Sequence, residues 1–464
     1  MAGLYISAAH KSSGKTSLSI GLCAAYSRSG IVVQPFKKGP DYIDPIWLSQ
    51  AAERPCINLD FNTQDNQSLR SSFERYSDQS QLSLIEGNKG LHDGMDINGS
   101  DSNAALARLL EVPVILVIDS SGMTRGVASL IQGLHSFDPE VTIRGVVLNR
   151  VGGTRHEGKL RMAIDRYTDL PVVGAVPKLA EISIIERHLG LIPGNEDEDA
   201  IERIDRLGST VEQCINLDQL FEIAGSSKIK KGVVVTPPLA PKEVSIGVAR
   251  DQVFGFYYQD DLEALERAGA KLHYFSPLSD PDLPPVDGIF IGGGFPEVHL
   301  ESLSANHGMR EAIKAFIDSG KPVYAECGGL MYLCRTISWG EKKVEMAGAL
   351  PADCRMHQRS RGRGYVRFRE SEAAPWPGAK GERTEYPAHE FHYSSLENID
   401  SGVEYAYQLL RGTGIDGGHD GLLWKNCLAA YLHQRDTAAN RWVERFVGFV
   451  REKKSQGFRE TSKQ

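Results

Sequence analysis

The segment Ala9–Thr16, with the sequence AHKSSGKT, follows a short β-type run and opens a helical pattern. This arrangement is typical of a phosphate-binding loop, although Ala9 stands where the motif usually has its first glycine. Backbone N–H groups at a helix start attract phosphate, Lys15 adds a positive charge, and the Thr16 hydroxyl suits Mg²⁺. An ordinary helix start is the alternative. The nucleotide-binding candidates are Ser12, Ser13, Gly14, Lys15 and Thr16.

Acidic side chains follow two further predicted strands. Asp41 and Asp44 lie three residues apart, beside prolines, in a loop expected near the phosphate site. Glu86 ends a strand, and Asp93 follows it in a glycine-rich loop. Such carboxylates bind Mg²⁺ or orient a reacting carboxyl group. Solvated loop acids and an ordinary turn aspartate are the alternatives.

A cysteine in the second half of the chain stands where a nucleophile would. Cys327 lies between a β-type run and a helical run in AECGGL, which is typical of a nucleophile elbow. We expect an exposed thiol whose pKa the helix start lowers. The three glycines of Gly292–Gly294 could stabilise an oxyanion, and His433 could act as the base. A buried structural cysteine is the alternative for Cys327 and suits the other six cysteines better.

Two α/β sheets would position these residues. The first half alternates short β-type runs with helical patterns such as Thr16–Ser29 and Asn103–Leu110, which predicts a parallel sheet. Its strands are expected at Gly3–Ala8, Ile31–Phe36, Leu82–Glu86, Val112–Asp119, Ile143–Asn149 and Val172–Val176. A stretch rich in small residues, lysine and proline precedes the second half and predicts a linker at residues 226–243. The alternation then restarts, with strands at Ser245–Ala249, Lys271–Phe275, Asp287–Ile291 and Pro322–Ala325 and helices at Gln259–Ala268 and His307–Ser319.

Composition narrows the class of protein. The chain has 464 residues, a net charge of −8 and seven cysteines without C-x-x-C spacing. The acidic balance argues against broad nucleic-acid binding, and the cysteines form no disulfide or zinc pattern. No apolar run is long enough for a membrane span, and the first residues lack the apolar region of a signal peptide. We therefore expect a cytoplasmic protein that binds neither nucleic acid nor membrane.

Taken together, the motifs resemble those of the cobyrinic acid a,c-diamide synthase family from Tyr5 to about Phe449. The matching blocks are KKGPDYIDP, the EG…DG loop, VILVID, GVVLNRVGGTRHE, ERHLGLIP, GGGFPE, AECGGLMYL, HEFHYS and AAYLH. The resemblance implies a P-loop domain of dethiobiotin-synthetase type at residues 1–225 and a class I glutamine amidotransferase domain at 244–450. A charged tail is expected at 451–464.

The resemblance also implies roles for the candidate residues. Cys327 matches the glutaminase nucleophile and His433 the histidine that activates it, while no acidic third member is assigned. Lys15 and Thr16 match phosphate and Mg²⁺ positions, and the acids around the metal and the reacting carboxylate match Asp41, Asp44, Glu86 and Asp93. Of these, Thr16, Asp41 and Glu86 are the candidate metal ligands. The implied reaction amidates acetate side chains of a tetrapyrrole with ATP, Mg²⁺ and glutamine; a homodimer remains open.

Five positions depart from the cobyrinate pattern. They are Lys38, Asn88, Lys89, His92 and Arg435. SAAHKSSGKT, PFKKGPDYIDP and EGNKGLHDG are more similar to the siroheme amidase branch, which makes siroamide by the same chemistry. Lys38, Lys89 and His92 each fall in a loop expected to face the reacting carboxylate of the acceptor, where added cationic and hydrogen-bonding groups would suit siroheme. Drift on solvent-facing loops is the alternative. The acceptor is thus either cobyrinate or siroheme.

An acceptor with many carboxylates needs cations on a chain of net negative charge. The arginine run of Arg359, Arg361 and Arg363, with Arg125, Lys37 and Lys38, could supply them, although a solvated surface run is the alternative for the arginines. A ParA-like P-loop ATPase switch is a hypothesis of another class. It would share the first 120 residues but would have no use for AECGG or AAYLH.

Overall fold

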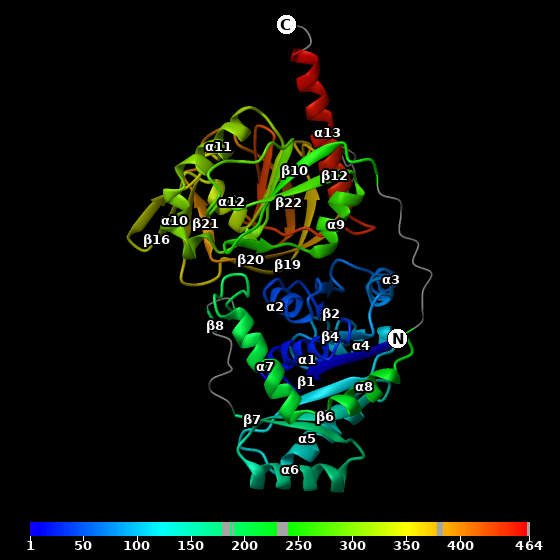
Figure 1. The fold of residues 1–464 in the computed structure, drawn as a ribbon. Helices are drawn as coiled ribbons and strands as arrows, with labels where there is room; N and C mark the ends of the chain where they lie inside the picture. Colours follow the sequence, from blue (N-terminus) through cyan, green and yellow to red (C-terminus); the bar gives the residue numbers. More distant parts are fainter. Residues whose placement is uncertain (179–185, 188–189, 230–239, 378–383, 462–464) are drawn as a thin grey trace. The chain divides into compact units, whose positions relative to one another are not determined.

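The computed structural model describes residues 1–178, 186–187, 190–229, 240–377 and 384–461. It divides the chain into two compact units, Met1–Val235 and Thr236–Gln464 (Figure 1). Each unit contains a sheet with helices on both faces. The predicted fold class, a parallel-sheet P-loop domain followed by a second α/β domain, is confirmed.

The sheet of the first unit has seven strands, and every neighbouring pair is parallel. Its strand order is β3-β2-β4-β1-β5-β6-β7, so β1 lies in the centre. Such strands are buried on both faces, which explains the nearly continuous apolar runs in the sequence. The strands are β1 (Ala2–Ala8), β2 (Val33–Lys38), β3 (Ile57–Leu59), β4 (Leu82–Glu86), β5 (Val114–Asp119), β6 (Ile143–Val151) and β7 (Val172–Pro177).

Side chains of β1 point alternately to the two faces of the sheet, and the core of this unit is accordingly divided into two clusters. Leu4 and Ile6 belong to a cluster with α1 (Lys15–Arg28), α2 (Ile43–Ala52), α7 (Ala200–Cys214) and α8 (Leu217–Gly225). Tyr5 belongs to the opposite cluster, with α3 (Asn66–Ser77), α4 (Asn103–Leu110), α5 (Gly126–Phe137) and α6 (Thr154–Tyr167). Successive side chains of a strand point to opposite faces, so one strand supports both layers. A short pair, β8 (Glu186–Arg187) and β9 (Gly190–Leu191), precedes α7.

One tryptophan links α2 to the segment before α7. Trp47 is fully buried, and its Nε1–H donates to the carbonyl oxygen of Ile192 at 2.7 Å. A Cβ atom at Gly194 would lie 3.3 Å from the same ring. This contact holds the chain after β9 against the helix that follows the Asp41 loop.

The second unit has a nine-stranded mixed sheet. Its order is β12-β10-β13-β15-β24-β23-β22-β19-β20; the first five strands are parallel and the rest pair antiparallel. The strands are β10 (Val244–Ala249), β12 (Ala270–Phe275), β13 (Gly288–Ile291), β15 (Val323–Glu326), β19 (Gly362–Glu370), β20 (Tyr386–His392), β22 (Glu404–Arg411), β23 (His419–Trp424) and β24 (Cys427–Ala430). The antiparallel half was not predicted. Short connections join β22 to β23 and β23 to β24, whereas β19 pairs with β22 across the segment that contains β20.

Helices and two small sheets cover the mixed sheet. One core contains α11 (His307–Asp318), α12 (Gly328–Leu333) and the sheet of β16 (Thr336–Trp339), β17 (Lys342–Glu345), β18 (Asp353–Met356) and β21 (Ser394–Glu397). The other contains α9 (Gln259–Arg267) and α13 (Trp442–Thr461). The remaining elements are β11 (Phe254–Phe256), which pairs with β14 (Gly293–Gly294), then η1 (Pro296–Val298) and α10 (Leu300–Ala305).

The C-terminal segment differs from the expected tail. Helix α13 continues through it to Thr461. Lys454 Nζ donates to the Asp287 carboxylate at 2.9 Å, and Arg451 forms an ion pair with Glu243. Residues 451–456 therefore belong to a helix that two ion pairs tie to the beginnings of strands β10 and β13.

Candidate functional site

The loop between β1 and α1 has the backbone that phosphate binding requires. Gly14 has φ +91°, and a Cβ atom there would lie 2.0 Å from Nδ2 of Asn149. The same amide donates to the carbonyl oxygen of Ser13 at 2.9 Å, so β6 fixes the loop. Gly14 gives α1 no side-chain cap, which leaves the first helical N–H groups available to an anion. Burial lowers the pKa of Lys15 to about 8.

Four charged side chains meet beside the start of α1. Thr16 Oγ1 donates to Glu86 at 2.5 Å and to Asp44 at 3.3 Å. Lys37, at the end of β2, contacts Asp44 and lies 2.9 Å from Glu86 and 3.8 Å from Asp41. Burial would lower the pKa of Lys37, but these carboxylates raise it well above its usual range. The structure thus brings three predicted acids together with Lys37, which the sequence suggested as a cation for the acceptor.

The arrangement of this cluster fits Mg²⁺ bound together with a nucleotide. Oε2 of the fully buried Glu86 has no hydrogen-bond partner among the described residues. Within the same described part, no three His, Cys, Asp or Glu side chains could hold a metal by themselves. Mg²⁺ usually takes one or two carboxylates and fills the rest of its shell with phosphate oxygens and water. Glu86, Thr16 and Asp44 are therefore the residues whose side-chain oxygens lie close enough together to bind one Mg²⁺.

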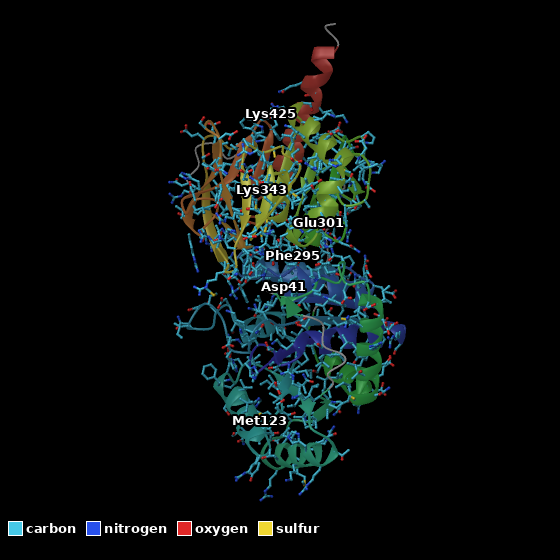
Figure 2. The ribbon with its side chains drawn as sticks, turned by 90° about the vertical axis from the view of Figure 1, so that its left-hand side faces the viewer. Asp41, Met123, Phe295, Glu301, Lys343 and Lys425 are labelled. Carbon is cyan, nitrogen blue, oxygen red and sulfur yellow. The ribbon has the colours of Figure 1, made fainter. Side chains whose placement is uncertain are left out.

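The two carboxylate oxygens of Asp41, which is labelled in Figure 2, have different partners. Its Oδ1 accepts from the backbone N–H groups of Ile43 and Asp44, at 2.9 and 3.1 Å, and so organises the start of α2. Oδ2 is the oxygen that lies 3.8 Å from Lys37. Its surroundings, chiefly burial and then the Asp44 carboxylate, raise the pKa of Asp41 to about 7.

Asp93 lies in a loop that packs on the phosphate-binding loop. Its Oδ2 accepts from the backbone N–H of Gly90 at 3.0 Å. A Cβ atom at Gly90 would lie 2.5 Å from the carbonyl oxygen of Ala9, and Leu91 N donates to Ala8 at 2.7 Å. The structure therefore brings Asp93 to this site, with one oxygen committed to its own loop.

The residues that depart from the cobyrinate pattern do not act as one group. Lys38 is buried, burial lowers its pKa to about 8, and its Nζ lies 3.4 Å from Oδ1 of Asn88. Lys89 is exposed beside them. His92 instead turns to α5, where its Nε2 lies 2.9 Å from the carbonyl oxygen of Leu134. The His92 ring is therefore engaged by α5 and not by the Lys38–Asn88 pair.

Cys327 stands at a strand-to-helix turn, as predicted, but its thiol is not exposed. Its φ is +46°, it caps α12, and its N–H donates to the carbonyl oxygen of Ala430 at 2.7 Å. The residue is 7% exposed, and Sγ lies 3.9 Å from the carbonyl oxygen of Phe391. Burial, with the carboxylates of Glu297 and Glu326, raises the thiol pKa above its usual range. The expected lowering is therefore wrong, and the thiol needs a base.

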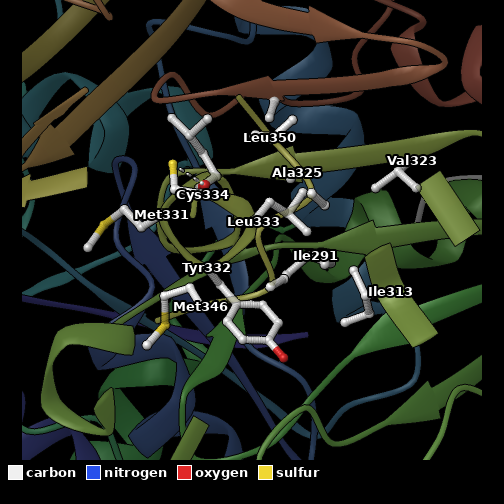
Figure 3. Packing of buried hydrophobic residues seen from close by; sticks show 14 of the residues in the cluster. Ile291, Ile313, Val323, Ala325, Met331, Tyr332, Leu333, Cys334, Met346 and Leu350 are labelled. Carbon is white, nitrogen blue, oxygen red and sulfur yellow. Dashed lines mark hydrogen bonds between the residues drawn. The ribbon is translucent and has the colours of Figure 1, made fainter. Parts of the chain in front are cut away.

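Packing of α12 fixes the position of this turn (Figure 3). Leu333 and Tyr332 of the helix belong to the same buried cluster as Ile291 at the end of β13 and Ala325 in β15. The helix is only six residues long, so these contacts rather than its length stabilise it. The cysteine backbone is thus held in its positive φ by the core beneath it.

Glycines of the Gly292–Gly294 turn pack directly on the elbow. A Cβ atom at Gly328 would lie 2.7 Å from the carbonyl oxygen of Gly294, and one at Gly294 would lie 1.7 Å from that of Val253. One at Gly293 would lie 2.6 Å from Cε1 of His433. The predicted oxyanion turn therefore lies against both the start of α12 and the histidine.

His433 follows the strand next to that of the cysteine. Strands β15 and β24 pair in parallel, with Glu326 opposite Ala430, so Cys327 and His433 follow the same ends of neighbouring strands. The His433 ring stacks on His389, with centroids 4.9 Å apart, and the two backbones form an isolated bridge. Nδ1 of His433 lies 3.2 Å from Oε2 of Glu326.

Glu326 was not predicted as a site residue, and Lys37 was predicted as a cation for the acceptor and not as a partner of these acids. Both lie within the last two residues of a buried strand, inside motifs already described. The same position, a carboxylate ending a buried strand, had pointed to Glu86. If carboxylates at the ends of buried strands had been taken as candidates in both units, Glu326 would have been predicted as well.

The predicted cations lie in different environments. The arginine run is exposed on and before β19, at Arg359, Arg361 and Arg363. The Arg363 guanidinium lies 5.3 Å from the centre of the Phe391 ring. Arg125 lies over Tyr167, at 5.1 Å. Lys37 is enclosed by carboxylates, so the arginine run remains the most accessible of these groups.

No helix in the described part of the chain is long and apolar enough to cross a membrane. Comparison with protein families gives two matches. Residues 6–192 match the CobQ/CobB/MinD/ParA nucleotide-binding domain, and residues 245–439 match the CobB/CobQ-like glutamine amidotransferase domain. A nucleotide-binding unit joined to a glutamine amidotransferase unit defines a glutamine-dependent amidoligase.

Relatives align over nearly the whole chain. The chain is 45% identical to the cobyrinate a,c-diamide synthase of Magnetococcus marinus, covering 97% of this chain and 98% of the relative. It is 39% identical to that of Archaeoglobus fulgidus, with 95% and 96% covered, and 38% identical to that of Methanosarcina acetivorans, with 94% and 92% covered. The chain belongs to the cobyrinate a,c-diamide synthase family. The predicted family is thus confirmed, and the ATPase-switch hypothesis is not favoured.

Proposed function

We propose that this protein amidates acetate carboxylates of cobyrinate, at the a and c positions, with ATP, Mg²⁺ and glutamine. The observation that carries the proposal is the presence of two built sites in one chain: a phosphate-binding loop beside buried carboxylates, and a cysteine elbow beside a histidine. Amidation needs both, because a carboxylate must be activated and ammonia must be generated.

The first unit would activate the acceptor carboxylate. A carboxylate is a poor electrophile, so its oxygen must attack the γ-phosphate of ATP and form an acyl phosphate with release of ADP. Lys15 and the N–H groups at the start of α1 would bind the phosphates. Glu86, Thr16 and Asp44 would hold Mg²⁺, which shields the negative charges that approach one another. Asp41 would fix the loop that carries Asp44.

The second unit would generate ammonia. His433 would take the proton of the buried Cys327 thiol, and the thiolate would attack the side-chain amide carbon of glutamine. N–H groups of Gly293 and Gly294 would bind the oxyanion, since that of Gly292 already donates to the Tyr257 hydroxyl. When the tetrahedral intermediate collapses, the carbon–nitrogen bond breaks and His433 returns the proton to the leaving ammonia. Water then hydrolyses the thioester to glutamate. Ammonia displaces phosphate from the acyl phosphate and forms the amide.

The acceptor would meet a cation of the first unit. Lys38 reaches the loop of Asn88 beside the acid cluster. The exposed arginines of β19 belong to the second unit and are a separate set of candidate cations for carboxylates. Each such pair adds affinity only where water is excluded, because exposed ion pairs contribute little. The buried Lys38 is therefore the cation that we expect to discriminate between acceptors.

The test is mass spectrometry of the product after incubation with glutamine labelled with ¹⁵N in its side-chain amide. Cobyrinate and siroheme are supplied separately, each with ATP and Mg²⁺. We expect cobyrinate to acquire two labelled amides and the reaction to stop when ATP or glutamine is omitted. Cobyrinate that stays unmodified while glutamine is hydrolysed would contradict the proposed acceptor.

Siroheme is the alternative outcome of the same experiment. Of the three side chains expected to contact a different acceptor, the structure keeps Lys38 and Lys89 near the acid cluster but turns His92 away. A higher kcat/KM for siroheme than for cobyrinate would assign the chain to the siroheme amidase branch. The double variant Lys38→Cys with Lys89→Met would then narrow the ratio of the two values.

A further inference from the structure

We propose that Glu326 is the positioning carboxylate of the glutaminase site, which holds His433 in the tautomer and orientation that the buried thiol requires. The proposal rests on the proposed roles of Cys327 and His433 as nucleophile and base. It assigns the acidic partner to the residue directly before the nucleophile, at the end of β15.

Both oxygens of Glu326 are engaged in a buried setting. The residue is 3% exposed. Its Oε2 lies 3.2 Å from Nδ1 of His433, while Oε1 accepts from the Tyr324 hydroxyl at 2.6 Å and from the N–H of Gln434 at 3.1 Å. Tyr324 is a strand neighbour two residues away, so it fixes the rotamer of the carboxylate from the same face. Glu326 therefore cannot turn away from the histidine without losing two further hydrogen bonds.

The contact settles which ring nitrogen carries the proton. An ionised carboxylate only accepts, so Nδ1 of the neutral His433 must carry the hydrogen that it donates. Nε2 then keeps its lone pair and can accept the thiol proton. When it does so, the imidazolium charge forms 3.2 Å from Oε2 of Glu326, where the carboxylate stabilises it. The same residue thus orients the base before proton transfer and balances its charge afterwards.

A network of buried polar groups supports the carboxylate. Nε2 of Gln434 donates to the hydroxyls of Tyr324 and Tyr407, at 3.1 and 2.8 Å. Nδ2 of Asn440 donates to the Gln434 side-chain oxygen at 3.0 Å. A buried network of this kind restricts its members to one arrangement. It joins the strand before the cysteine to the segment after the histidine.

The other charged groups around His433 do not replace Glu326. His389 stacks on the ring, and burial, with His433 and Arg435, holds its pKa well below the usual range, so it stays neutral.

The remaining charged groups nearby are engaged elsewhere. Arg435 pairs with Asp260 at 2.7 Å and lies over the Tyr258 ring. Asp261 binds the N–H of Asp436. The negative charge of Glu297 acts on the cysteine and raises the pKa of Cys327. Glu326, in contrast, is hydrogen-bonded directly to the His433 ring, 3.2 Å from Nδ1.

The test compares Glu326→Gln with a matched variant, Glu390→Gln. Glu390 is equally buried in the same unit, but its oxygens accept from the N–H groups of Thr413 and Gly414 and not from His433. For both variants one measures glutamine hydrolysis, ammonia-dependent amidation, and the rate at which 6-diazo-5-oxonorleucine labels Cys327 from pH 5 to 9.

We expect Glu326→Gln to lower kcat for glutamine hydrolysis about 10²-fold or more, with a small change in KM, because a carboxamide can present the wrong hydrogen-bonding group to Nδ1. Loss of the negative charge should also move the acidic limb of the labelling profile to lower pH by about one unit or more, since the imidazolium loses its partner. Ammonia-dependent amidation should persist. Glu390→Gln should leave the limb in place.

Glu326→Asp provides the second variant. It keeps the charge but shortens the side chain, so we expect a lower kcat with the acidic limb near its wild-type position. The proposal is overturned if Glu326→Gln hydrolyses glutamine at the wild-type rate. It is also overturned if the acidic limb of the Cys327 labelling profile lies at the same pH in Glu326→Gln as in Glu390→Gln. Were Glu326→Gln to unfold, a wild-type kcat in Glu326→Asp would overturn it instead. Failure of the wild-type protein to hydrolyse glutamine would reject the proposed function and not the position of this carboxylate.

Discussion

At the scale of single residues, burial decides how each candidate group can react. Burial raises the pKa of Cys327 and lowers that of Lys15 to about 8. Cys327 is therefore not a free thiolate, and Lys15 is not a solvent-exposed cation. Each depends on a neighbour: the cysteine on a histidine base, and the lysine on phosphate charge that would raise its pKa again.

Removing the thiol should separate the two half-reactions. Cys327→Ala is expected to abolish glutamine-dependent amidation and to leave amidation with ammonium chloride near the wild-type rate, because only ammonia generation uses the thiol. Assays with each nitrogen source check this. Cys334→Ala, a buried cysteine on the same helix whose Sγ donates to Leu330, is the control and should keep both activities. Loss of the ammonia-dependent reaction in folded Cys327→Ala would contradict the two-site mechanism.

Lys15 should behave in the opposite way. Lys15→Ala is expected to lower amidation with glutamine and with ammonia equally, by about 10²-fold or more, because acyl phosphate formation precedes both. The matched control is Lys11→Ala, an exposed lysine of the same loop. Initial rates at saturating ATP check the prediction. A Lys15→Ala protein that lost only the glutamine-dependent rate would place the lysine outside the activation step.

At the scale of elements, the strand ends carry the chemistry. Lys37 is the next-to-last residue of β2, Glu86 ends β4, and Glu326 ends β15 directly before Cys327. The parallel strands could be predicted because their signals are local apolar runs, and the glycine–lysine loop is local as well. The contacts of Glu326 with His433 and of His92 with α5 could not, because they join positions 107 and 42 residues apart. The strand order that creates such contacts is a long-range property.

A buried aspartate near the start of β23 is hydrogen-bonded to the residues that directly precede His433. Asp420 accepts from the N–H groups of Gly421, Tyr431 and Leu432, and its pKa is raised to about 6 because it is fully buried. The folded state therefore binds this proton more tightly than the unfolded chain does. The stability that Asp420 contributes is present below about pH 4 and is lost as pH rises through about 6.

The difference in unfolding free energy between wild type and Asp420→Asn should accordingly fall between pH 4.5 and 7.5, by about 1–3 kcal/mol. Urea unfolding at four pH values measures it. Asp353→Asn is the control: despite some burial, hydrogen bonds from Asn398 and Thr336 lower the pKa of Asp353, so the corresponding difference should stay flat over this range. A flat difference for Asp420→Asn as well would show that its proton does not contribute.

At the scale of the whole molecule, two units each contain their own pair of cores. Clusters around β1 involve residues of the first unit, and clusters around β13 and β15 involve residues of the second. Apolar burial stabilises a domain in proportion to the area removed from water, and each unit is within the usual size of an independent domain.

We therefore expect fragments 1–235 and 236–464 to fold separately. The first should bind a fluorescent ATP analogue, and the second should be labelled at Cys327 by 6-diazo-5-oxonorleucine. Circular dichroism should show a cooperative thermal transition for each. Single-residue controls are Lys15→Ala in the first fragment and Cys327→Ala in the second. A fragment that remains unfolded alone would show that its core depends on the other unit.

The contact of Trp47 with Ile192 also has an optical consequence. Of the five tryptophans, Trp47 is the one within residues 1–235, while Trp339, Trp376, Trp424 and Trp442 belong to the second unit. Replacing those four by phenylalanine would leave a single indole, whose Nε1–H reports on the chain that follows β9. Its emission would shift to longer wavelength if water reached the ring. The protein thus contains a natural fluorophore on the helix directly after the Asp41 loop, beside the proposed nucleotide site.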